Sequence, residues 1–238
     1  MKKFTLSVVA ALSMSAFALA GGDIAPVEPA VVVPAPMVDD SGFYVGVAYA
    51  AGRYNNDYDG WEYNLAPDLY EWSGEEEVDY NGIMAQAGYK FNQYIAIEGR
   101  YWWSLGDGDY SDKGSETLNG FPNTTWDYDA DYGDELRAWG IYVKPMFPVT
   151  EQFDIYALLG YGNVQLENDF GEWLDESDFQ WGIGASYEFT ENLSIFVDYV
   201  RLYDEDNSAS WALAADLYGE DNWDEEVYTI NVGLTYKF

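Results

Sequence analysis

The sequence predicts an all-β protein, an eight-stranded antiparallel up-and-down transmembrane β-barrel. Three observations predict this fold. Apolar side chains alternate with small or polar ones in eight runs, each near the roughly 9 to 11 residues that a tilted membrane strand requires. The links between the runs are alternately short and long, and most of the acidic residues lie in the long links.

The first forty residues are expected to lie outside the barrel. A basic start at Lys2 and Lys3 precedes a short apolar stretch and the small residues Ala18 and Ala20, so residues 1–20 are interpreted as a signal peptide. Residues 21–40 hold four of the eight prolines and are interpreted as an extended periplasmic linker. The barrel domain is then expected at residues 41–238.

In the first four runs the apolar and aromatic side chains occupy one face. Glycine, alanine and polar residues dominate the other face, which is the alternation of a half-buried strand. The runs and their apolar faces are 43–51 (Phe43, Val45, Val47, Tyr49), 82–91 (Ile83, Ala85, Ala87, Tyr89, Phe91), 95–104 (Ile95, Ile97, Tyr101, Trp103) and 138–145 (Trp139, Ile141, Val143).

The last four runs repeat the pattern, and 179–189 shows the cleanest alternation. They are 153–162 (Phe153, Ile155, Ala157, Leu159, Tyr161), 179–189 (Phe179, Trp181, Ile183, Ala185, Tyr187, Phe189), 193–200 (Leu193, Ile195, Val197, Tyr199) and 228–238 (Tyr228, Ile230, Val232, Leu234, Tyr236, Phe238). Eight strands of this length leave no room for a second domain.

The links divide into two classes. The short links are 92–93, 148–152 and 190–192, and the long ones are 53–79, 106–135, 167–178 and 204–226. Short turns at one end and long loops at the other are typical of outer-membrane barrels, with both termini at the short-turn, periplasmic end. The long links hold 33 of the 43 acidic residues, so long acidic extracellular loops are expected.

Composition excludes several functions. The chain has 43 acidic and 10 basic residues, a formal net charge of −33, and neither histidine nor cysteine. Imidazole and thiolate bases, nucleophiles and metal ligands are therefore missing, so we expect no enzyme and no cofactor. The negative charge repels phosphate, so we expect no nucleic-acid partner.

The alternating pattern also fits a soluble cup with its apolar face inside. Aromatic side chains at both ends of the apolar face favour a membrane barrel instead, because interfacial girdles place them there. They are Phe91, Phe147, Phe153, Phe189 and Phe238 near the short links, and Tyr49, Trp103, Trp139, Tyr161 and Tyr199 near the long links.

The signal peptide, the eight runs and the closing segment 228–238 resemble the OmpA/OmpX-like family of small, porin-like outer-membrane barrels. The resemblance covers residues 41–238. It implies the outer membrane of a Gram-negative cell envelope, with lipid and lipopolysaccharide as surroundings. It further implies that the final aromatic residue, Phe238, is the assembly signal recognised by the barrel assembly machinery.

The inward face of the runs carries four basic and four acidic side chains. They are Lys90, Glu98, Arg100, Lys144, Asp154, Glu188, Asp198 and Lys237. A buried charge without a partner pays several kcal/mol of desolvation, so we expect these charges to pair and plug the lumen. Such a network is either a structural polar core or a gate whose pairs exchange to open a narrow pore.

The long links suggest three further features. Asp127, Asp129 and Asp131 alternate like the start of a calcium loop, but Tyr132 and Ala138 stand where an EF-hand needs Gly and Glu. We therefore expect at most a diffuse accumulation of divalent cations. Residues 211–218, after Ser210, could form a short helix. Six tryptophans could form binding hot spots or pack among themselves: Trp61, Trp72, Trp126, Trp173, Trp211 and Trp223.

The sequence as a whole favours a non-enzymatic outer-membrane barrel with a structural or cell-surface interaction role, carried by its acidic extracellular loops. The alternative is a small cation-preferring pore gated by the interior charge pairs.

Overall fold

The computed structural model describes residues 41–64, 68–130, 132–214 and 217–238. The expected signal peptide and Pro-rich linker lie outside these residues. The described residues form ten strands: β1 (Gly42–Asn64), β2 (Leu69–Asn92), β3 (Ile95–Ser104), β4 (Asp109–Leu118), β5 (Phe121–Ala130), β6 (Glu135–Pro148), β7 (Phe153–Asn168), β8 (Gly171–Glu188), β9 (Leu193–Ala214) and β10 (Leu217–Lys237). In this part of the chain no helix is long and apolar enough to cross a membrane.

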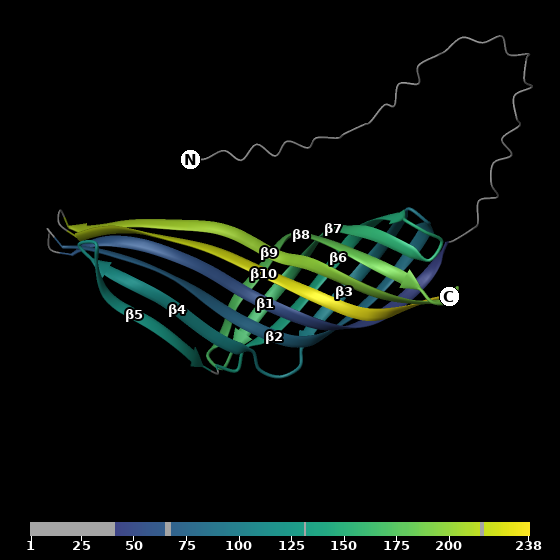
Figure 1. The fold of residues 1–238 in the computed structure, drawn as a ribbon, viewed down its shortest axis with the longest axis horizontal. Coiled ribbons are helices and arrows are strands. Elements are labelled where there is room, and N and C mark those ends of the chain that lie inside the picture. Colours follow the sequence, from purple (N-terminus) through teal and green to yellow (C-terminus); the bar gives the residue numbers. More distant parts are fainter. Residues whose placement is uncertain (1–40, 65–67, 131, 215–216) are drawn as a thin grey trace, which may run out of the picture. The chain divides into compact units, whose positions relative to one another are not determined.

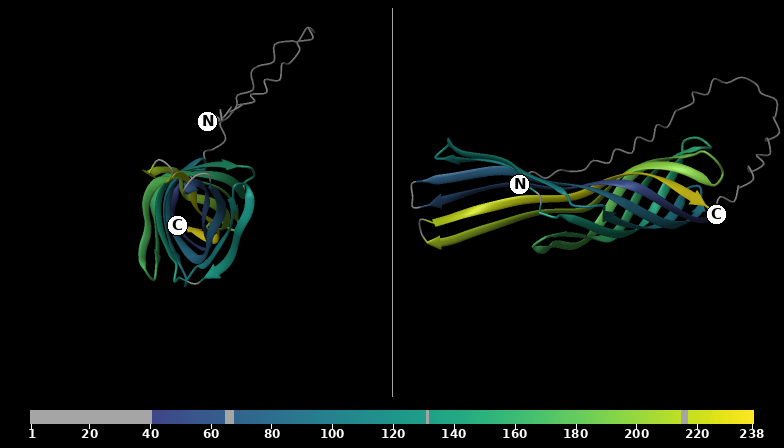
Figure 2. Two further views of the ribbon diagram at one scale, coloured as in Figure 1. Left: turned by 90° about the vertical axis from the view of Figure 1, so that its left-hand side faces the viewer. Right: turned by 90° about the horizontal axis from the view of Figure 1, so that it is seen from below.

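Eight of these strands close into a ring, in the order β1-β2-β3-β6-β7-β8-β9-β10. Every pairing in the ring is antiparallel, and β1 closes it by pairing with both β2 and β10. Figure 2 shows the ring from one end in its left-hand view. The prediction of an eight-stranded antiparallel up-and-down barrel is confirmed.

The two faces of the strands separate as the alternation predicted. On β1, Tyr44 and Ala48 are buried inside the ring, whereas Val45 and Val47 point outward and are 46% and 54% exposed. The outward apolar side chains form a belt around the barrel, with members on all eight ring strands. They include Val45, Val47, Tyr89, Ile97, Ile141, Val143, Ile155, Leu159, Ile183, Val197, Ile230, Val232 and Leu234. A belt of this extent is far larger than the apolar patches of soluble monomers, so it indicates a lipid-facing surface.

Four strands continue well beyond the length that a membrane requires. β1, β2, β9 and β10 have 23, 24, 22 and 21 residues, and a strand of that length spans about 75 Å at roughly 3.3 Å per residue. β4 and β5 form a hairpin that pairs with the outer part of β2 and lies outside the ring (Figure 1). Together these segments form a six-stranded sheet in the order β9-β10-β1-β2-β4-β5. We call this sheet, residues 53–64, 69–79, 109–130, 203–214 and 217–227, the extension sheet.

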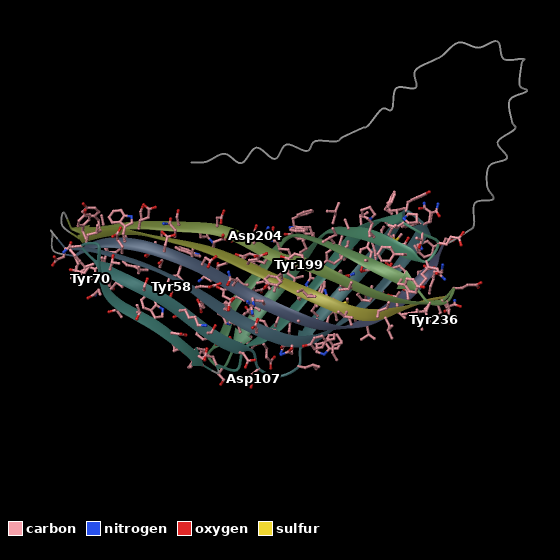
Figure 3. All side chains as sticks on the ribbon, in the orientation of Figure 1. Tyr58, Tyr70, Asp107, Tyr199, Asp204 and Tyr236 are labelled. Carbon is pink, nitrogen blue, oxygen red and sulfur yellow. The ribbon has the colours of Figure 1, made fainter. Side chains whose placement is uncertain are left out.

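The extension sheet corrects the expectation of long acidic loops. Most of the acidic residues of 53–79, 106–135 and 204–226 lie on strands, and residues 167–178 belong to the β7–β8 hairpin. Figure 3 shows Tyr70 at the far tip of the sheet and Tyr236 near the C-terminal end of the barrel. Asp, Asn and Gly have low strand propensity, so the sequence pattern indicated loops where cross-strand pairing makes strands.

Aromatic rings on neighbouring strands cover the glycines of the extension sheet. A Cβ atom at Gly60 would lie only 2.5 Å from the ring of Trp72, its partner across β1 and β2. Gly114 is covered in the same way by Trp126 of β5. Trp72 and Trp126, which were expected in loops, therefore pack on the sheet.

The expected helix at 211–218 is wrong. Trp211 to Ala214 continue β9, and Leu217 and Tyr218 begin β10. At the tip, Tyr218 packs against Trp61 and Tyr63 with ring centroids 5.8 and 5.2 Å apart. Contacts with residues more than 150 positions away in the sequence therefore determine the conformation of this segment.

Candidate functional site

The centre of the barrel is an ion-pair network around Arg100 of β3. Its guanidinium donates two hydrogen bonds to Asp198 of β9, from Nη1 to Oδ1 (3.0 Å) and from Nη2 to Oδ2 (2.8 Å). Its Nε donates to Oε1 of Glu98 (2.5 Å). The side chains of all three residues have no exposed surface. Arg100 therefore joins two buried carboxylates from nearly opposite points of the ring.

A second cation and several uncharged groups complete the network. Lys144 of β6 places Nζ 3.0 Å from Oε2 of Glu98, and the Tyr44 hydroxyl donates to the same oxygen (2.6 Å). Asp198 also accepts hydrogen bonds from Tyr156 (2.8 Å) and Asn231 (2.9 Å). Buried charges are tolerated when they are paired with opposite charges and hydrogen-bonded, and these two acids and two bases meet that condition.

Aromatic rings pack around the cations. Nζ of Lys144 lies 4.1 Å from the ring centroid of Tyr156, and Arg100 lies about 6 Å from the rings of Trp102, Tyr142 and Phe196. Trp102 is almost fully buried and donates from Nε1 to Asn231 (3.0 Å). The interior at this level is filled by polar and aromatic side chains.

The other predicted lumen charges lie at the short-turn end of the barrel. Lys90 places Nζ 3.8 Å from Oε1 of Glu188. Asp154 and Lys237 are half-buried and, with Lys90, Lys144 and Glu188, line a hollow of about 60 Å³ at that end. The structure thus brings Glu98, Arg100, Lys144 and Asp198 into one central cluster and places the other four at the rim.

Sequence reasoning missed the uncharged partners. Tyr44, Trp102, Tyr156 and Asn231 all lie on the inward face of predicted strands, so the alternation located them. Their role was not predicted because alternation does not show which residues of separate strands share one level. Strand register, such as Trp102 opposite Ala138, supplies that information.

The extension sheet carries rows of acidic side chains. Directly paired residues of an antiparallel sheet share a face, and one such row crosses all six strands. The row reads Asp206, Asp224, Asp57, Glu75, Lys113 and Asp127 on β9, β10, β1, β2, β4 and β5. Four consecutive acids at directly opposite positions repel one another and destabilise the sheet.

Burial and this repulsion act together on the pKa of Asp224. Partial burial, then Asp206, then Asp57 raise the pKa of Asp224 above its usual value. These three aspartates lie around a hollow of about 630 Å³ on the extension sheet. Partial burial and the neighbouring carboxylates therefore favour the protonated form of Asp224.

Basic residues neutralise the acids near the barrel. Arg53 lies 2.6 Å from both Glu77 and Asp79, and Arg201 contacts Glu226 at 3.4 Å. In the described extension sheet, Lys113 is the only other basic residue, and its Nζ lies 3.9 Å from Asp127. The described extension sheet therefore carries a large excess of negative charge, most of it in the rows at Asn55 to Asp57.

The candidate calcium triad is only partly described. Asp127 and Asp129 lie on β5, and Asp131 lies outside the described residues. Within the described residues no three acidic side chains are placed to hold a metal ion.

A closed ring with an apolar outer belt and a charge-paired interior defines a transmembrane β-barrel. Residues 4–238 match the outer membrane protein beta-barrel domain family, and the chain belongs to that family. Its place is therefore the cell outer membrane. No curated protein matches the chain.

Three solved structures illustrate the similarity in fold. They are Ail of Yersinia pestis (17% identity, 83% of this chain and 99% of that chain covered, TM-score 0.40), OprG of Pseudomonas aeruginosa (12%, 83% and 96%, 0.45) and Neisserial surface protein A (15%, 83% and 97%, 0.42).

Proposed function

We propose that this protein is a non-enzymatic surface-interaction protein, in which the barrel anchors the extension sheet and the sheet binds a positively charged partner. The row of four consecutive acids from Asp206 to Glu75 carries this proposal. Like charges at paired positions reduce stability, and a basic protein surface would offset that loss on binding. Complementary charge also accelerates association and strengthens selection of the partner.

The orientation follows from the same charge. We propose that the extension sheet lies outside the cell and that the short turns and both termini are periplasmic, the arrangement typical of outer-membrane barrels. An excess of negative charge on the sheet favours a position away from the anionic membrane surface. Divalent cations that neutralise lipopolysaccharide would also accumulate around these rows.

Phe238 is proposed as the assembly signal that the barrel assembly machinery recognises. It follows the last residue of β10 and is 71% exposed, with its ring 5.2 Å from that of Tyr236. An exposed aromatic side chain at the end of this strand is available to a partner.

The filled interior argues against the alternative of a cation-preferring pore. Glu98, Arg100 and Asp198 interlock across the ring, and opening a path would separate charges that have no exposed surface. We therefore expect no steady conductance when the protein is reconstituted into planar bilayers. A stable, cation-selective current would instead support the gate interpretation of the network.

Binding of a fluorescent oligolysine peptide to the protein in nanodiscs tests the surface role. The triple variant D57N/D206N/D224N removes three acids from the row and should weaken binding at least about fivefold, with a weaker dependence on salt. The matched control, E172Q/D175N/E176Q in the β7–β8 hairpin, removes the same net charge from exposed positions. If both variants lose affinity equally, net charge alone attracts the peptide. The proposal that the extension sheet binds the partner would then be wrong.

A further inference from the structure

A cavity of about 300 Å³ lies where three hairpins meet at the long-strand end of the barrel. Its lining comes from β2, β4, the segment before β6, and the β7–β8 hairpin. The residues are Glu76, Val78, Tyr110, Tyr132, Asp134, Asn168, Phe170 and Trp173. This volume is at the lower end of the range for small-molecule sites. We call this cavity the aromatic cage.

Four aromatic side chains form its walls, and their planes are inclined to one another. The rings of Tyr110 and Tyr132 have centroids 5.0 Å apart and planes at 71°. The rings of Tyr132 and Phe170 lie 6.3 Å apart at 61°. Trp173 packs edge-to-face against Tyr54 at 4.8 Å, which fixes its position. The rings that line the cavity therefore lie in different planes, and Phe170 is 85% exposed.

Two carboxylates lie among these rings. Asp134 is 2% exposed, and Glu76 is half-buried and accepts a hydrogen bond from Asn56 at 3.3 Å. Burial, together with Tyr128 and Glu76, raises the pKa of Tyr110, so this hydroxyl stays protonated. None of the described residues that line the cavity is basic. The cavity therefore combines negative charge with the electron-rich faces of aromatic rings.

Backbone contacts hold the cage together without a ligand. The Asp169 N–H donates to the carbonyl of Tyr132 (2.9 Å), and the Gly108 N–H donates to the carbonyl of Asp134 (2.7 Å). Gly133 has a φ of +71° and its position for Cβ lies 2.6 Å from Asp169. A side chain at 133 would be strained in this conformation and would displace the Asp169 carboxylate. Buried Val78 forms an apolar part of the lining.

We propose that the aromatic cage binds the alkylated ammonium group of a small organic cation. Such a group has an apolar surface and a diffuse positive charge, which the faces of aromatic rings attract. Glu76 and Asp134 supply the opposite charge. A metal ion would need several converging oxygen ligands, whereas four of the eight lining residues are aromatic. This site is separate from the acidic row, and its ligand is a small molecule.

Ligand-observed saturation-transfer NMR with choline as the probe tests this proposal. The full chain is studied in octyl glucoside micelles, whose head group carries no ammonium group. Choline should receive saturation, and its uncharged isostere 3,3-dimethylbutanol should bind at least about tenfold more weakly, because it lacks the charge. Potassium at the same concentration should not displace choline. Equal binding of the isostere, or displacement by potassium, would overturn the proposal.

Paired variants locate the site. Tyr132→Leu should weaken choline binding by about threefold to thirtyfold, while Phe121→Leu, at an exposed hairpin tip, should not. Glu76→Gln should weaken binding about tenfold or more, and its neighbour on the opposite face, Glu75→Gln, should have little effect. If Glu75→Gln weakens binding as much as Glu76→Gln, the cage is not the site. The Tyr132→Leu variant should bind oligolysine as tightly as the wild-type protein does. That result would show that the failure of one proposal does not imply the failure of the other.

Discussion

Arg100→Leu is expected to destabilise the barrel by about 3 to 5 kcal/mol, because removing one partner leaves the buried Glu98 and Asp198 carboxylates without their shared cation. Both carboxylates have no exposed surface, so water cannot replace the guanidinium. The measurement is urea unfolding in micelles, followed by the difference in electrophoretic mobility between folded and heated samples.

The control for this change is Arg137→Leu. Arg137 also contacts two acids, Glu135 and Glu167, but its side chain is 50% exposed. Its loss should cost less than about 1 kcal/mol. Adding Asp198→Asn to Arg100→Leu should restore part of the stability, because it removes one of the two uncompensated charges. Equal effects of the two arginine substitutions would mean that water reaches the centre of the barrel.

Trp102→Ala is expected to destabilise the barrel by about 3 to 5 kcal/mol, the usual cost of removing a buried indole. Trp102 is 1% exposed, and its loss also leaves Oδ1 of Asn231 without the 3.0 Å hydrogen bond from the indole. The same unfolding experiment measures the effect.

The neighbouring tryptophan provides a matched control. Trp103 lies on the opposite face of β3, is partly exposed, and packs against Tyr101 at 5.8 Å. Trp103→Ala leaves no interior cavity and should cost clearly less than Trp102→Ala. Because Arg100 lies 6.0 Å from the Trp102 ring, the Arg100 and Trp102 changes should not be additive. Equal costs for the two tryptophans would contradict the assignment of the inward face.

The central network contributes specificity as well as stability. Charges from β3, β6 and β9 meet only when the strands pair in the observed register, and a slip of one residue would move them to the lipid face. A charge on the lipid face near the membrane centre costs about 2 to 4 kcal/mol for Arg or Lys. The paired interior therefore disfavours misregistered barrels.

The alternation of apolar and polar side chains along each run was enough to predict the barrel. Runs such as 179–189 show which residues face lipid and which face the interior, because side chains of a strand alternate regardless of its partners. The same alternation placed all eight lumen charges on the inward face, and the unequal links separated the two ends of the barrel.

Only the tertiary structure decided how those residues meet. The acidic row requires Asp57 of β1 to lie beside Asp224 of β10, and the aromatic cage joins four separate segments of the chain. The segments called loops became strands because each gained a partner strand and covering aromatic rings. Period-two alternation is a property of neighbours in sequence, whereas register, strand extension and cavities are properties of residues far apart in it.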